Sequence, residues 1–129
     1  LGIKESIEPY LEKETVVLWS EMPLSVAGSI MEFAAVEACP VIDSSLKLVG
    51  MISRRDFQKL RRDSHLRAPV KAYMRQPVQT IEPGKSPLQA ARIMIRQDIG
   101  RLPVVEDGRM IGIVTRSDVM CYFYDLLPE

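Results

Sequence analysis

The sequence predicts an α/β (α+β) fold made of two tandem copies of one small unit, each with the order strand, helix, strand, strand, helix. Two observations support this. The phrase Gly, two apolar residues, Ser or Thr, Arg, any residue, Asp occurs as GMISRRD at 50–56 and again as GIVTRSD at 112–118. The pair Pro-Val at Pro40 recurs 63 residues later at Pro103. Such internal repeats mark a duplicated supersecondary unit.

The first two elements of the second copy are a short strand and a helix. Residues 78–81 (VQTI) alternate in polarity as a strand does. Ser86, followed by a proline and by Gln89 three residues later, forms a capping box that begins a helix. The apolar spacing predicts that this helix buries Leu88, Ala91, Met94 and Ile95.

A hairpin and a second helix complete this copy. Residues 102–105 (LPVV) and 110–114 (MIGIV) are expected to pair across the two-residue turn Asp107-Gly108. After Thr115 a helix is expected to run through Val119, Met120 and Phe123.

The first copy follows the same order. Residues 15–19 (TVVLW) are its first strand, 39–42 and 48–52 its hairpin, and 54–60 open its last helix. Its first helix is expected to carry the apolar residues Val26, Ile30, Met31, Ala34 and Ala35.

The predicted boundaries are a leader at 1–14, a first motif at 15–63, a linker at 64–77 and a second motif at 78–125. The leader is expected to form part of a helix with Pro9 near its start. From Arg54 to Arg75 the local net charge is +6. A contact with RNA or an acidic partner and a solvated, basic linker both fit this charge, and we favour the linker.

Composition excludes several classes of function. Formal net charge is +0, so no overall field favours nucleic acid or membrane, and no apolar run approaches the roughly 20 residues of a membrane span. Cys39 and Cys121 lack CxxC spacing, which argues against a zinc site; we expect two buried, reduced thiols in a cytoplasmic protein. His65 has no accompanying nucleophile motif, and no catalytic carboxylate pair is evident, so we expect no enzyme activity.

The repeated phrase has two compatible interpretations. The hydroxyl residue with an Asp three residues later is a capping box. The same helix start also suits a ligand, because free N–H groups and the Arg bind phosphate and the carboxylate accepts from ribose hydroxyls. The residues concerned are Ser53, Arg54 and Asp56, and Thr115, Arg116 and Asp118.

Residues 102–118, their echo at 39–56, and the run SPLQAARIM at 86–94 resemble the cystathionine-β-synthase-type (CBS) domain, and together the copies resemble a CBS pair, or Bateman module. The resemblance implies packing about a pseudo-twofold axis and dimerisation through the helices. It also implies binding of AMP, ADP, ATP or S-adenosylmethionine, with the hydroxyl residue facing phosphate and the Asp holding the ribose.

By this resemblance the second copy holds the more complete site, because in the first copy Val17 replaces Thr80 and Ala38-Cys39 replaces Arg101-Leu102. The ligand-binding residues it implies are Thr80, Arg101, Leu102, Pro103, Thr115, Arg116 and Asp118, with Ser53, Arg54 and Asp56 in the first copy.

The stretch HLRAPVKAYM at 65–74, with its flanking motifs, is similar to the CBS pair of bacterial tRNA nucleotidyltransferases of the poly(A)-polymerase family. This similarity, and a start at Leu1 rather than Met, lead us to expect a regulatory fragment of a longer enzyme that contacts tRNA only through its parent. The alternative is a structural dimerisation or spacer module whose ligand sites are vestigial.

Overall fold

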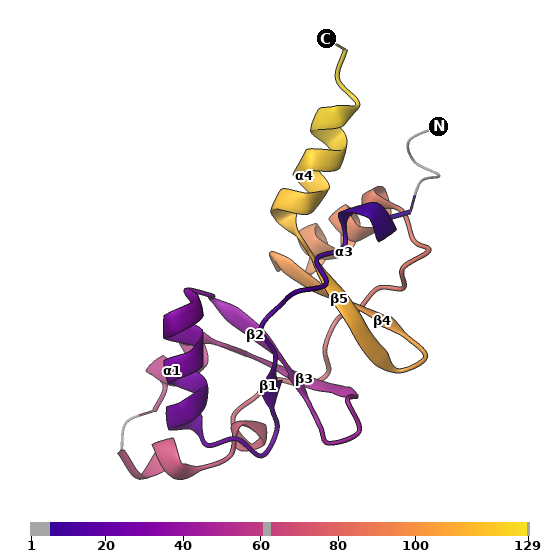
Figure 1. Cartoon of the computed structure of the whole chain (residues 1–129). Coiled ribbons are helices and arrows are strands. Elements are labelled where there is room, and N and C mark those ends of the chain that lie inside the picture. The colour runs from indigo at the N-terminus through magenta and orange to yellow at the C-terminus, as the bar shows by residue number, and fades with distance from the viewer. Residues whose placement is uncertain (1–5, 61–62, 129) are drawn as a thin grey trace. The chain divides into compact units, whose positions relative to one another are not determined.

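The computed structural model describes residues 6–60 and 63–128 (Figure 1). The start of the predicted leader, residues 1–5, lies outside the described residues, as do Arg61 and Arg62 of the basic stretch. The chain divides into two compact units. We call residues 16–78 the Ser53 unit, and residues 79–129 together with residues 1–15 the Thr115 unit.

The Ser53 unit has the predicted element order. Its elements are β1 (Leu18–Trp19), α1 (Leu24–Ala34), β2 (Ala38–Ile42), β3 (Leu48–Ser53) and α2 (Arg54–Gln58), followed by single 3₁₀ turns at Asp63–Arg67 and Val70–Ala72. The strands form one sheet in the order β1-β2-β3, in which β1 runs parallel and β3 antiparallel to β2. The predicted strand, helix, strand, strand, helix order is therefore confirmed for the first copy.

Helix α1 buries only part of the apolar set that the sequence predicts for it. Leu24, Ala27 and Met31 point into the core, whereas Val26 is 45% exposed. Ala35 lies beyond the helix, where it adopts a left-handed conformation (φ 55°) and ends α1. Only Met31 of the predicted set is fully buried, because the position of the sheet, and not apolar spacing alone, decides which face is covered.

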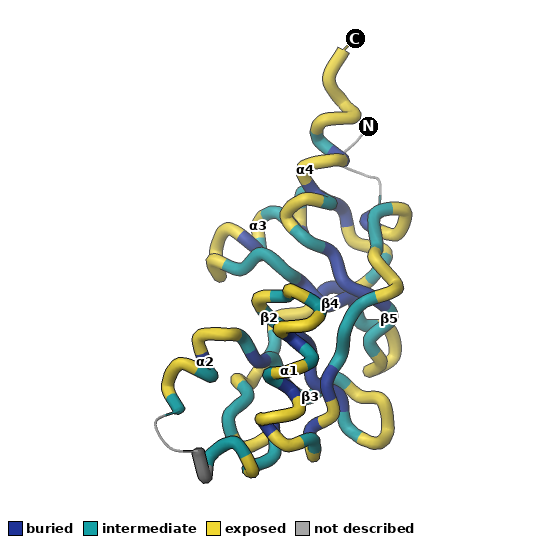
Figure 2. Tube along the Cα trace, turned by 60° about the vertical axis from the view of Figure 1, so that its left-hand side comes forward, coloured by how far each residue is buried: buried dark blue, intermediate teal, exposed yellow. Residues whose placement is uncertain are grey.

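The Thr115 unit consists of α3 (Pro87–Gln97), β4 (Arg101–Glu106), β5 (Arg109–Thr115) and α4 (Arg116–Asp125), with a 3₁₀ turn at Glu8–Tyr10. Strands β4 and β5 pair antiparallel across Asp107 and Gly108, both with positive φ, as the sequence predicts. Burial is concentrated in the strands, and the outer faces of the helices are exposed (Figure 2). Cys39 is buried as expected, but Cys121 on α4 is exposed.

The predicted strand at 78–81 is reduced to one residue. Ile81 forms a parallel bridge with Val104, its N–H donating to the Pro103 carbonyl at 3.0 Å. Residues 78–80 do not join the pairing, because the next bond of a parallel ladder would have to come from the N–H of residue 103, and Pro103 has none.

Helix α3 begins with the predicted capping box, in which the Gln89 N–H donates to Ser86 Oγ at 3.2 Å. Its buried residues are Pro87, Ala90 and Met94. Of the predicted set only Met94 is buried, since Pro87 and Ala90 take the places of Leu88 and Ala91, and Ile95 is 79% exposed. Apolar residues occur in adjacent pairs along this helix, so periodicity does not choose between the two faces. Packing against the sheet does.

Two segments flanking the predicted motifs are packed parts of the units. The first strap, residues 7–12, lies beside β5, and the second strap, residues 70–75, lies beside β3 (Figure 1). Glu12 and Ile113 exchange main-chain hydrogen bonds of 2.8 and 2.9 Å, and Arg75 and Met51 exchange bonds of 2.7 and 3.1 Å. Each strap thus adds a one-residue antiparallel bridge to the outer edge of its hairpin.

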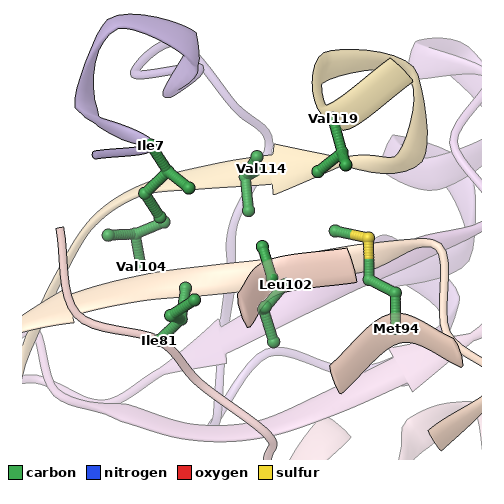
Figure 3. Close-up of a cluster of buried hydrophobic side chains, with 8 residues drawn as sticks. Ile7, Ile81, Met94, Leu102, Val104, Val114 and Val119 are labelled. Atoms are coloured by element: carbon green, nitrogen blue, oxygen red, sulfur yellow. The ribbon is translucent and has the colours of Figure 1, made fainter. Parts of the chain in front are cut away.

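The straps are anchored by fully buried aliphatic side chains, Ile7 in the first and Val70 in the second. Figure 3 shows Ile7 directed at Val104 and Val114 within the core of the Thr115 unit. Here the structure differs from the predicted boundaries, which place these residues in a leader and a linker. Each strap precedes one copy in sequence but packs on the strands of the other, which sequence order cannot reveal. The predicted motifs at 15–63 and 78–125, and the pseudo-twofold axis, stay predictions.

None of the helices among residues 6–60 and 63–128 is long and apolar enough to cross a membrane.

Candidate functional site

Thr115 ends β5 and caps α4, where its side chain and that of Asp118 form a closed hydrogen-bond set. Asp118 Oδ2 accepts from the Thr115 N–H at 2.8 Å and from the Thr115 hydroxyl at 2.9 Å. The Asp118 N–H donates to Thr115 Oγ1 at 3.2 Å. The predicted capping box is therefore present, and it brings a hydroxyl, a carboxylate and N–H groups together at one helix start.

Ser53 occupies the equivalent position at the end of β3. Asp56 Oδ2 accepts from the Ser53 N–H at 2.7 Å and from the Ser53 hydroxyl at 3.1 Å. The Asp56 side chain is nearly buried. A buried carboxylate needs such donors to offset its lost hydration, so the capping interpretation is confirmed for both phrases.

The arginine of each phrase contacts the end of the preceding helix. Arg116 Nε donates to the Ile99 carbonyl at 3.3 Å, and its guanidinium lies 3.4 Å from Asp98 Oδ1. Arg54 Nε likewise donates to the Val36 carbonyl at 3.1 Å. Both side chains are about half exposed, so these contacts are weak. The arginines thus have a structural contact in addition to the phosphate contact that the resemblance implies.

The glycine that opens each phrase is required by the straps. A Cβ on Gly112 would lie 2.5 Å from Leu11 Cδ1 and 2.7 Å from the Glu12 carbonyl oxygen. A Cβ on Gly50 would lie 2.7 Å from Met74 Cγ. At Gly112 the overlap with main-chain oxygen excludes any larger residue, whereas at Gly50 the short contact is with the Met74 side chain and the nearest main-chain atom, the Arg75 carbonyl oxygen, is at 3.2 Å.

The other predicted ligand residues lie on β4 and just before Ile81. Arg101 is the cross-strand partner of Thr115 and is half-buried. Leu102 is fully buried in the core (Figure 3), so its side chain faces away from solvent. Pro103 is also buried, and Thr80 is exposed beside a cavity of about 230 Å³. Arg101 and Thr115 thus lie opposite each other on β4 and β5, and Thr115 is hydrogen-bonded to Asp118. Thr80 directly precedes Ile81, which bridges to Val104 on the other side of β4.

Glu12 of the first strap belongs to this cluster and was not predicted from the sequence. Its Oε2 accepts from the Thr115 hydroxyl at 3.3 Å. A hydrogen bond with the Asp118 carboxyl raises the pKa of Glu12, as do partial burial and the charge of Asp118, against smaller lowering effects of Thr115 and Arg101.

Arg75 of the second strap was also missed, and it occupies the equivalent position. Its Nε lies 3.6 Å from Asp56 Oδ2. The spacing from Glu12 to Arg75 is 63 residues, the spacing of the repeat, and Tyr10 and Tyr73 are related in the same way. The matching tyrosines are the sequence signal that would have identified Glu12 and Arg75, because they extend the repeat alignment to both straps.

Among the described residues, no group of three or more His, Cys, Asp or Glu side chains is placed to hold a metal ion.

Comparison with protein families matches the CBS domain to residues 7–63 and again to residues 70–125. The protein MJ1232 of Methanocaldococcus jannaschii is 33% identical over the whole chain, which spans 40% of that protein. The A-adding tRNA nucleotidyltransferase of Aquifex aeolicus is 29% identical over 92% of the chain, which spans 16% of the enzyme. The chain thus spans less than half of either relative.

The crystal structure of CBSX2 in complex with AMP superimposes with a TM-score of 0.84 at 25% identity, covering 95% of this chain and 98% of that one. Duplicated units with capped helix starts, and two matches to one domain family, define the class: this chain is a pair of CBS domains. It belongs to the CBS domain family.

Proposed function

We propose that the chain is a regulatory, non-catalytic module that binds an adenosine compound, AMP, ADP, ATP or S-adenosylmethionine, at the helix starts of its two phrases. The observation that carries this proposal is the cluster of Thr115, Asp118 and Arg101. It offers the Arg101 guanidinium to an anionic group, and a carboxylate that accepts from ribose hydroxyls. The AMP complex of the related CBSX2 supports the choice of ligand.

A calorimetric titration of adenosine, AMP, ATP and S-adenosylmethionine tests this function. We expect saturable binding that Asp118→Asn weakens at least tenfold, because the amide keeps a cap acceptor but loses the charge that holds ribose hydroxyls. Asp125→Asn is the matched control, since Asp125 is exposed at the far end of α4. Absence of binding at millimolar concentration would refute the proposal.

The longer protein from which we expect this module to come is also a proposal. Similarity to the Aquifex enzyme and the short span of the chain within it support a cytoplasmic tRNA nucleotidyltransferase as the parent, with any tRNA contact made by other parts of that protein. Homodimerisation through the helices is supported by large apolar side chains that α1, α3 and α4 expose. These are Val26, Phe33, Ile95, Met120 and Tyr124.

A second candidate is a dimerisation or spacer module without ligand. The observation that favours it is that Arg54 and Arg116 bind main-chain carbonyls and both aspartates serve as caps, so the arginine and the aspartate of each phrase have structural contacts without any ligand. Sedimentation and thermal unfolding, with and without nucleotide, separate the two candidates. A dimer whose melting temperature does not change with any adenosine compound would favour the dimerisation or spacer module.

A further inference from the structure

The two capping aspartates of the chain have neighbours of opposite charge. Asp118 faces the carboxyl of Glu12, which shares the Thr115 hydroxyl with it. Asp56 faces the guanidinium of Arg75 at 3.6 Å. Glu12 and Arg75 hold the same position in their straps, and each is bonded to its hairpin through main-chain atoms. The side-chain charge therefore differs while the local backbone is the same.

The local charge follows directly from these neighbours. In the Thr115 unit, Glu12, Asp118 and Arg101 together leave one negative charge once both carboxyls are ionised. In the Ser53 unit, Asp56 and Arg75 cancel, and the residue at the position of Arg101 is the neutral Ala38. The arginines of the two phrases do not change this difference, because each has an acidic neighbour, Asp98 for Arg116 and Glu37 for Arg54.

From this asymmetry we propose that Glu12 determines ligand specificity at the Thr115 site, which takes adenosine compounds whose C5′ substituent is cationic, as in S-adenosylmethionine, in preference to the phosphorylated compounds. The inference rests on the proposed function and narrows its ligand. A nucleoside that contacts Thr115 and Asp118 places its C5′ group within a Debye length of Glu12 in any orientation, since the Glu12 oxygen is only 3.3 Å from the hydroxyl.

The energetic argument compares charges on one nucleoside. At C5′, S-adenosylmethionine carries a sulfonium of charge +1, and AMP carries a phosphate of about −2. A carboxylate at about 7 Å in a solvated site discriminates between such groups by roughly tenfold or more. Adenosine, neutral at C5′, serves as the reference that reports binding of the nucleoside alone.

The test titrates adenosine, AMP and S-adenosylmethionine into the full chain and follows the amide signals of Thr115 and Ser53 by NMR, so that each site is read separately. We expect S-adenosylmethionine to bind at Thr115 at least tenfold more tightly than AMP. Glu12→Gln should reduce this ratio to threefold or less, each affinity being taken relative to that of adenosine for the same variant. The control Glu8→Gln, also exposed and on the same strap, should keep the wild-type ratio.

The outcomes separate the two proposals. If adenosine, AMP and S-adenosylmethionine all leave the Thr115 amide unchanged at millimolar concentration, the proposed function fails and this inference with it. If adenosine binds but AMP binds as tightly as S-adenosylmethionine, or if Glu12→Gln leaves their ratio intact, only the inference is overturned. An unchanged Ile113 amide signal in Glu12→Gln verifies that the strap keeps its main-chain bonds to β5.

Discussion

At the scale of single residues, each member of the repeated phrase has a physical function. The glycine allows a strap to cross the strand, the hydroxyl and carboxylate cap the helix, and the arginine binds the carbonyl just past the preceding helix. A capping box explains the hydroxyl and the carboxylate but not the glycine or the arginine. Those two depend on chain segments remote in sequence, such as Leu11 and Ile99.

Gly112→Ala is expected to destabilise the protein by about 2–3 kcal/mol, because the new methyl group overlaps Leu11 and the main chain of Glu12. Urea unfolding measures the change. Gly84→Ala is the control, since a Cβ at Gly84 would meet nothing within 4 Å, and it should change stability by less than about 0.5 kcal/mol. Equal effects of the two substitutions would contradict the crossing argument.

The raised pKa of Glu12 predicts a pH dependence of stability. A carboxyl group whose pKa is higher in the folded state than in the unfolded chain binds more protons when folded, so its contribution to stability is full below the ordinary pKa of 4.5 and is lost as pH rises through the folded pKa. Glu12→Gln removes this loss. We expect the variant to melt about 1–2 °C above wild type at pH 7, allowing for solvent screening.

Calorimetric melting between pH 4 and pH 7 checks this prediction. The gap between Glu12→Gln and wild type should narrow toward pH 4, because protonation of Glu12 increases in both states as pH falls below its ordinary pKa of 4.5. A gap that stays constant over this range would contradict it. Glu14→Gln, an exposed acid just past the same strap, should show no such trend.

At the scale of elements, local signals determined where the helices and the tight hairpin begin and end, and packing determined which faces they bury. The caps at Ser86 and Thr115 and the turn at Asp107-Gly108 formed where their sequences predict. Such signals act within a few residues, so distant parts of the chain do not override them. The buried face of α3 depended instead on contacts with the sheet.

Ser86→Ala is expected to cost about 1 kcal/mol of stability, because the first turn of α3 loses the hydroxyl that accepts from the Gln89 N–H. Denaturant unfolding measures it. The exposed Ser117, in the first turn of α4, offers a control, and Ser117→Ala should lie within about 0.5 kcal/mol of wild type. A neutral Ser86→Ala would show that the capping box does not limit stability.

At the scale of the whole molecule, each strap packs on the hairpin of one unit although it precedes the predicted motif of the other in sequence. The first strap precedes the strands of the Ser53 unit in sequence but completes the Thr115 unit, whereas the second strap follows those strands and completes the Ser53 unit. Each unit therefore depends on a buried side chain from outside its own predicted motif. This places Glu12, near the chain's start, against a site built mostly from residues 101–118.

The packing of the straps predicts which unit each strap stabilises. Ile7→Ala should destabilise the Thr115 unit by about 2–4 kcal/mol, since Ile7 is fully buried among Val104 and Val114. Hydrogen exchange should then increase in β4 and β5 and change little in β2 and β3. Val70→Ala should do the reverse, with faster exchange in β2 and β3. Faster hydrogen exchange in the strands of the opposite unit would contradict this assignment of the straps to the units.

By itself the sequence determined the duplication, the order of elements, the caps, the hairpin turn and the membership of Thr115 and Asp118 in one helix start. All of these depend on residues within a few positions of one another or on a repeat that can be aligned by inspection. Only the tertiary structure decided that the straps cross the glycines, that α3 buries Ala90 and Met94, and that Glu12 lies against Asp118. The physical reason is that these depend on contacts between segments far apart in the chain, where several packings satisfy the same apolar pattern and only the closely packed core selects one.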